Sequence, residues 1–125
     1  MRRLAPLAFL TLIACSAATL YVRQQSDTLY FGANKAHGGV ITDAEWEQFL
    51  REVVTPRFPG FTHWKARGEW MNQAEETRVL VIVHGMGDER AIREIVSEGE
   101  RRLDQLEVFQ VRSDVWLPAS ELRTK

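Results

Sequence analysis

The chain has 125 residues, 45% of them hydrophobic and 26% charged, with a formal net charge of −1. This length favours a single domain, and the composition excludes general disorder. Without Arg2 and Arg3, 14 basic and 17 acidic side chains remain. We expect no nucleic-acid partner, because a weakly acidic domain with scattered basic residues lacks the positive patch that nucleic acid requires.

The N-terminus has the layout of an export signal. Arg2 and Arg3 precede an uncharged apolar run from Leu4 to Cys15, which is too short to span a bilayer comfortably. Residues 12–15, Leu-Ile-Ala-Cys, resemble the bacterial lipoprotein box. The resemblance implies a thioether-linked diacylglycerol on Cys15, cleavage before it, and acylation of the new amino terminus, for example by palmitate. We therefore expect a signal peptide over 1–14 and a lipid-anchored tether over 15–27.

Two alternatives to lipidation stay open. The uncharged stretch also continues through Tyr21 and Val22 as far as Arg23, and this greater length suits an uncleaved membrane anchor. Plain secretion is the second alternative. A disulfide within the chain is excluded because Cys15 is the only cysteine. Both tethered versions place the domain in the bacterial cell envelope, facing the periplasm or the cell exterior, with the lipid bilayer as a partner.

Six segments with alternating character follow. Residues 28–32 predict a short strand, and 33–39 predict a loop. Thr42 and Glu45 form a capping-box pattern ahead of an amphipathic helix, which Pro56 ends. The apolar face of this helix consists of Trp46, Phe49, Leu50, Val53 and Val54.

The second half repeats the order of strands and helix. Residues 61–70 alternate like a half-buried strand, with Trp64 and Trp70 on the apolar face. A hairpin connection over 71–76 leads to 77–84, which is apolar on both faces and so should be central. A helix capped by Asp88 should extend to Leu106. A strand over 107–113 should follow, then docked residues 115–117 and a frayed tail over 118–125.

This order predicts an α+β fold over residues 28–117. Two split βαβ units give a ferredoxin-like βαββαβ sandwich, with a four-stranded antiparallel sheet and two helices on one face. The first and third strands should be central.

Several motifs in residues 28–84 are similar to those of one bacterial family of secreted proteins, often lipoproteins, with no established function. The motifs are Phe31-Gly32, the helix carrying Trp46 and Phe49, residues 55–59 (Thr-Pro-Arg-Phe-Pro), and Gly68 with Trp70. The resemblance implies an envelope location and one compact domain, and it implies no activity.

A ferredoxin-like sheet leaves one face uncovered, and an exposed aliphatic stripe costs about 25 cal/mol per Å². We expect a second copy of the domain, the Trp116 segment or a small apolar ligand to cover that face. Strand parity predicts a weak ligand-binding rim there, and a solvated strand face with ordinary charge pairs is the alternative. The rim residues are Tyr30, His63, Arg67, His84 and Arg112.

No catalytic motif, cofactor site or metal site is predicted. His37, His63 and His84 lie far apart in the sequence, without zinc-type spacing, and the glycine-rich loop at 31–40 lacks the spacing of a phosphate loop. The sequence favours a membrane-tethered envelope lipoprotein with a binding or self-association domain, forming a homodimer through the sheet. The alternative is a small cofactor-free enzyme, oxygenase- or isomerase-like, with its site beside the open face; it rests on fold analogy alone.

Overall fold

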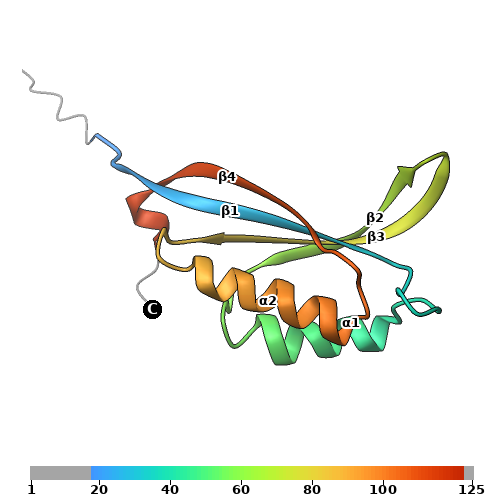
Figure 1. Ribbon diagram of the computed structural model, residues 1–125. Helices are drawn as coiled ribbons and strands as arrows, with labels where there is room; N and C mark the ends of the chain where they lie inside the picture. Colours follow the sequence, from blue (N-terminus) through green and yellow to red (C-terminus); the bar gives the residue numbers. More distant parts are fainter. Residues whose placement is uncertain (1–17, 123–125) are drawn as a thin grey trace, which may run out of the picture.

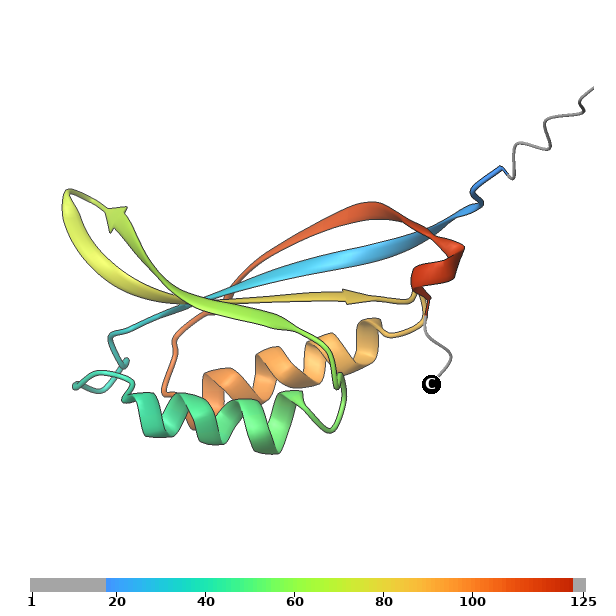
Figure 2. The same ribbon diagram turned by 180° about the vertical axis from the view of Figure 1, so that it is seen from behind.

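The computed structural model describes residues 18–122. Its elements are β1 (Tyr21–Gly32), α1 (Asp43–Phe49) with a π-helical extension η1 (Leu50–Val54), β2 (Thr62–Trp70), β3 (Gln73–His84), α2 (Glu89–Arg102), β4 (Phe109–Pro118) and a 3-10 turn η2 (Ala119–Glu121). The strands form one antiparallel sheet in the order β2-β3-β1-β4. Both helices lie on the same side of this sheet (Figures 1 and 2). This confirms the ferredoxin-like βαββαβ fold with the first and third strands central.

The predicted capping box at the start of α1 is present. The Thr42 hydroxyl accepts a hydrogen bond from the Glu45 backbone N–H at 3.1 Å, and the Glu45 carboxylate accepts one from the Thr42 N–H at 2.8 Å. The helix ends at Val54, just before Pro56 as predicted, but its last turn is π-helical. Thr55 donates both its N–H and its hydroxyl to the carbonyl of Leu50, and this contact completes the wider turn.

The core lies between the central strands and the helices. Phe31 packs edge-on against Trp46 and Phe49 of α1, with ring centroids 5.2 and 5.6 Å apart. The alternation of β3 turns Leu80, Ile82 and His84 toward the helices and Val79, Val81 and Val83 away from them. The other buried side chains of the core include Leu29 of β1, Val53 and Val54 of η1, Ile92 and Ile95 of α2, and Leu103 directly after α2.

The start of β1 differs from the sequence prediction. Residues 23–27 belong to β1 and not to a tether, because β4 pairs with β1 without interruption from Tyr30↔Phe109 to Tyr21↔Pro118. Residues 115–118 are correspondingly strand, so the sheet is longer at this end than the polar composition suggested. The predicted signal peptide and Cys15 lie outside the described residues.

Two further boundaries differ. The β2–β3 connection is a two-residue turn at Met71 and Asn72, both with positive φ (48° and 63°), which is the backbone geometry of a tight type I′ hairpin. The second helix ends at Arg102, and Leu106 is 88% exposed instead of lying on its apolar face.

Gly99 allows α2 to approach the sheet closely, and we expect Gly99→Ala to destabilise the fold. A Cβ atom there would lie 2.6 Å from Cε1 of Phe31 and 3.3 Å from Cζ of Phe49. Overpacking costs about 1–3 kcal/mol, which outweighs the ~1 kcal/mol that alanine gains in a helix. Urea unfolding should show a lower free energy of unfolding. The control Ser97→Ala, at an exposed position of the same helix, should leave it unchanged within ~0.5 kcal/mol. Equal stability of the two variants would refute this packing argument.

Candidate functional site

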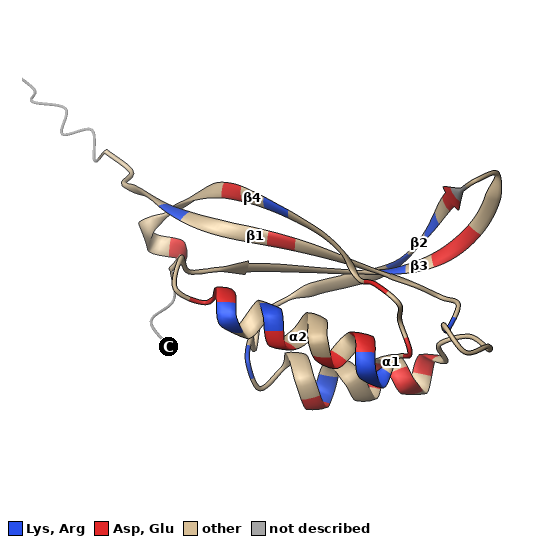
Figure 3. Ribbon diagram, in the orientation of Figure 1, with Lys and Arg blue, Asp and Glu red and all other residues tan. Residues whose placement is uncertain are grey.

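The sheet face away from the helices, hereafter the open face, carries no formal charge across the body of the sheet in the described part of the chain. Directly paired residues share a face and neighbours along a strand alternate, so the register assigns each side chain to one side. The open face consists of Val22, Gln24, Ser26, Thr28 and Tyr30 of β1, Thr62, Trp64 and Ala66 of β2, Thr77, Val79, Val81 and Val83 of β3, and Phe109, Val111, Ser113, Val115 and Leu117 of β4. Figure 3 shows charged residues on the helices, on the β2–β3 hairpin and at single positions of β1 and β4, whereas the half of β3 that leads to α2 has none.

Large apolar side chains are exposed on the open face. Phe109 is 63% exposed, and Trp64, Val83 and Val111 are between 43% and 46% exposed. The register aligns Trp64, Val79, Tyr30 and Phe109 as one row across the whole sheet, and the Tyr30 and Phe109 rings lie 5.7 Å apart. Four strands of about eight residues cover on the order of 500 Å² in projection. The exposed apolar side chains within this area make it the candidate interaction site of the described chain.

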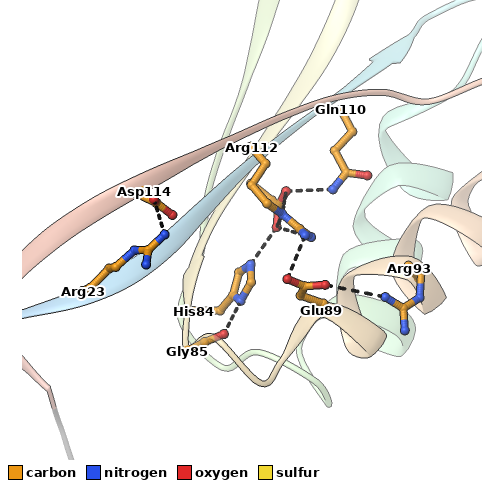
Figure 4. A network of polar contacts seen from close by, with 9 residues as sticks. Arg23, His84, Gly85, Glu89, Arg93, Gln110, Arg112 and Asp114 are labelled. Atoms are coloured by element: carbon orange, nitrogen blue, oxygen red, sulfur yellow. Dashed lines mark hydrogen bonds and ion pairs between the residues drawn. The ribbon is translucent and has the colours of Figure 1, made fainter.

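A polar cluster lies on the helix side of the sheet, at the end where α2 begins (Figure 4). The Asp27 carboxylate is completely buried and accepts hydrogen bonds from Gln110 Nε2 at 2.7 Å and from Arg112 Nε and Nη2 at 3.1 Å. His84 Nε2 lies 2.6 Å from the same carboxylate. Arg112 also contacts Glu89 of α2 at 3.2 Å. The cluster therefore ties β1, β3, β4 and α2 together.

The environment of Asp27 keeps it ionised. Burial alone would raise the pKa of this carboxyl, but the hydrogen bonds from Arg112, Gln110 and His84 outweigh burial and hold its pKa below the ordinary value of 3.8. Arg112 is stabilised in return, since the Asp27 carboxylate raises the pKa of its guanidinium.

The His84–Asp27 contact has the residue types of a catalytic dyad but not the access. His84 Nδ1 is engaged with the Gly85 carbonyl at 2.8 Å, Nε2 with Asp27, and its side chain is 0% exposed. No ring nitrogen of His84 is left to meet a substrate. The arrangement serves as a clamp between elements.

The structure does not bring the five predicted rim residues together. Tyr30 lies on the open face, whereas His84 and Arg112 meet at Asp27 on the helix side. His63 is directly opposite Leu80, also on the helix side, and its Nδ1 lies 3.3 Å from Nε1 of Trp46. Arg67 pairs with Glu76 in the β2–β3 hairpin. The prediction that all five share one face is wrong.

The error has a physical cause. The sequence prediction assigns Trp64 and Phe109 to the core because they are large and apolar, yet β2 and β4 are edge strands. Apart from Trp116 and Pro118 near the end of β4, their helix-side positions are polar or charged, as Lys65 and Gln110 show, and Trp64 and Phe109 face outward. The enzyme alternative required a cavity enclosing Tyr30, His63 and His84, and the sheet itself separates Tyr30 from the two histidines.

The sequence prediction misses Asp27 and Gln110 as functional or structural centres. It places Asp27 inside the tether, although the alternation of Leu29 and Phe31, extended backward, puts Asp27 and Gln25 on the core side. Within residues 18–122 no group of three His, Cys, Asp or Glu side chains is placed to hold a metal ion. No helix in that range is both long enough and apolar enough to cross a bilayer.

Strand order and helix placement define a ferredoxin-like α+β domain. The family model for proteins of unknown function DUF3574 matches residues 26–118, and the chain belongs to this family. The sequence-based prediction of a family without established function is confirmed to that extent. No curated protein matches the chain significantly.

Two solved structures are similar in fold. One is a putative PII-like signaling protein from Thermus thermophilus, with 19% identity and a TM-score of 0.47, covering 81% of this chain and 95% of that one. The other is the de novo designed protein LFR1 1 with a ferredoxin fold, with 14% identity and a TM-score of 0.33, covering 83% and 90%. At these identities the likenesses say nothing about function.

We expect Asp27→Asn to lower the free energy of unfolding by about 3 kcal/mol at pH 7, the low end for a broken buried pair. The folded-state pKa of Asp27 is depressed, so its contribution is complete above pH ~4 and is lost as pH falls through the folded pKa. Urea unfolding at pH 7 and at about pH 2 should therefore show the difference from wild type shrinking in acid.

Asp114→Asn is the matched control. Asp114 is on the same side of the sheet and pairs with Arg23 at 2.6 Å, but both side chains are about half exposed. Its loss should cost less than ~1 kcal/mol. A difference between Asp27→Asn and wild type that is the same at both pH values would show that the carboxylate charge is not what stabilises the clamp.

Proposed function

We propose that this domain is a non-enzymatic interaction module of the bacterial cell envelope that self-associates through the open face. The observation that carries the proposal is that the body of that face has no formal charge, combined with exposed Trp64, Val83, Phe109 and Val111. Among the described strand residues, the one charged side chain with the parity of this face is Glu75, near the β2–β3 hairpin. Leaving this apolar area in water costs about 25 cal/mol per Å². Association removes that cost without having to desolvate an ion.

A second copy of the chain is the partner that the face suits best. Isologous association brings the same surface of two chains together. A charged residue on that surface would lie against the same charge of the other chain, or would need an opposite charge placed to pair with it. The body of the open face avoids both problems because its polar residues are the neutral side chains Ser, Thr and Gln, and Glu75 lies at its edge, near the β2–β3 hairpin. Its projected area of roughly 500 Å², before side-chain relief is counted, is more than half of the ~800 Å² per partner of a standard interface.

The envelope location rests on the N-terminal sequence. The apolar run after Arg2 and Arg3 and the Leu-Ile-Ala-Cys box support export and a lipid anchor on Cys15. An uncleaved anchor over the same stretch would leave the domain on the same side of the membrane. In either form, tethering concentrates the chains on one surface, which favours weak association between copies.

We expect Val111→Lys to shift the protein from dimer to monomer, with at least a tenfold higher dissociation constant. Val111 is 43% exposed on the open face of an edge strand, so the lysine is solvated in the monomer and buried in the proposed dimer. Analytical ultracentrifugation of the protein over a range of concentrations measures the effect.

Leu106→Lys is the control for this experiment. Leu106 is the most exposed large apolar residue in the described chain and lies in the α2–β4 loop, away from the open face. It receives the same type of substitution and should keep the wild-type mass. A monomeric wild type at all concentrations, or equal weakening by both lysines, would refute self-association through this face.

The anchor is tested separately by Cys15→Ser. Intact-mass analysis should find a diacylglycerol adduct and N-acylation on wild type starting at residue 15, and neither on the variant. If wild type and variant both retain residues 1–14 and stay in the membrane fraction, the uncleaved anchor is correct and lipidation is not.

A further inference from the structure

The end of the sheet where β1 begins and β4 ends carries exposed apolar side chains that neither the core nor the open face explains. Leu20 is 74% exposed, Tyr21 58% and Trp116 62%. They are held close together, because Tyr21 pairs with Pro118, Arg23 pairs with Trp116, and the Leu20 carbonyl accepts a 2.7 Å hydrogen bond from the Ala119 N–H. Figure 1 shows this end at one extreme of the molecule, beyond the start of α2.

These side chains lie on both sides of the sheet. Val22 and Leu117 pair with each other and belong to the open face, whereas Tyr21 and Trp116 have the opposite parity and lie on the helix side, where none of the described helices covers them. A second copy packed on the open face covers only one of these sides. An apolar layer into which the end dips edge-on covers both.

Regular structure begins very close to the proposed anchor. Paired strand starts at Tyr21, and the hydrogen bond from Ala119 fixes Leu20 as well, so Leu20 follows Cys15 by only five positions. Five residue steps span at most about 18 Å when fully extended. A headgroup layer is on the order of 5–8 Å thick. The sheet end is therefore confined to the membrane surface if Cys15 carries a lipid, and an uncleaved anchor confines it equally.

The residue types suit that position. Tryptophan and tyrosine favour the membrane–water interface, where the ring is in an apolar layer and the polar tip stays hydrated. Of the charges at this end, Arg23 and Asp114 pair with each other at 2.6 Å, and Glu121 of η2 is exposed.

We propose that the sheet end formed by Leu20, Tyr21, Val22 and Trp116 is seated in the interfacial layer of the bilayer that holds the N-terminal anchor. This inference rests on the tether in the proposed function. Seating the sheet end gives the tethered domain one orientation, in which β1 and β4 rise from the membrane and the β2–β3 hairpin is farthest from it.

The test uses the full chain purified with its own N-terminal modification and reconstituted in phosphatidylcholine vesicles. Lipids brominated near the top of the acyl chain quench only tryptophans at that depth. Of the four tryptophans, Trp116 should be quenched, so Trp116→Phe should lose more than half of the wild-type quenching. Trp64→Phe, on the open face in the middle of the sheet, is the matched control and should keep it.

The possible outcomes distinguish the seated sheet end from the tether. Vesicle flotation without quenching of wild type overturns the seated end and leaves the tether intact. Loss of quenching in Trp64→Phe but not in Trp116→Phe also overturns it, because the open face then lies on the membrane. Failure of wild type to float shows that the tether itself is wrong, and the seated end falls with it.

Discussion

The register of β1 against its two neighbours is the constraint on which the rest of the molecule depends. Eight pairs join β1 to β3, and ten join it to β4. A slip of one residue would turn Leu29 and Phe31 to solvent and Tyr30 into the core, so burial of these side chains enforces the alignment. The same alignment sends Asp27 inward and the uncharged residues of β1 outward. The core, the clamp and the open face are three consequences of one pairing.

The Asp27 clamp, which Asp27 forms with His84, Gln110 and Arg112, lies where the apolar core ends. Toward the middle of the sheet, Leu29, Phe31 and Leu80 pack under the helices, but nearer the start of α2 the inward positions of β1, β3 and β4 include Asp27, His84 and Arg112. An isolated buried carboxylate would be very costly, and three donor side chains offset that cost here. Because the donors come from two different strands, and Arg112 reaches Glu89 of α2, the contact fixes how these elements meet more than it adds net stability.

Much of the architecture follows from the sequence, because periodicity reports burial. The capping box at Thr42, the apolar face of α1 and the doubly apolar β3 each predicted an element that the structure contains. What failed was the assignment of faces on the edge strands and the extent of β1. The apolar core lies over the central strands, and the edge strands meet the helices through polar side chains such as His63 and Arg112. At Trp64 and Phe109 hydrophobicity therefore indicates an outward face rather than the core. No single-strand pattern reveals which strand is at an edge. Likewise, Gln25 and Asp27 look like tether residues until the partners of Asp27, which come from distant parts of the sequence, are known.

The proposed dimer and the proposed membrane seat constrain each other. Two copies that pack face to face are related by a two-fold axis lying between the sheets. If that axis is perpendicular to the strands, the two N-terminal ends point in opposite directions. They are then separated by the length of the 12-residue β1, roughly 40 Å. With β1 rising from the membrane as in the proposed seat, the ~18 Å available between Cys15 and Leu20 cannot bridge that separation, so both copies could not be seated in one bilayer.

An axis that runs along the strands removes the conflict, because both N-terminal ends then meet the same membrane. It also sets the contacts. If the axis of the proposed dimer passes between β1 and β3, the two central strands, each β3 faces β1 of the other copy. Thr28 and Val81 are paired in the register and lie at one level, which brings the valine of one copy against the smaller threonine of the other. Trp64 and Phe109 share the next row, so each tryptophan on one edge meets a phenylalanine on the opposite edge. Complementarity of this kind, large against small at the centre and aromatic against aromatic at the rim, is what a self-associating face requires.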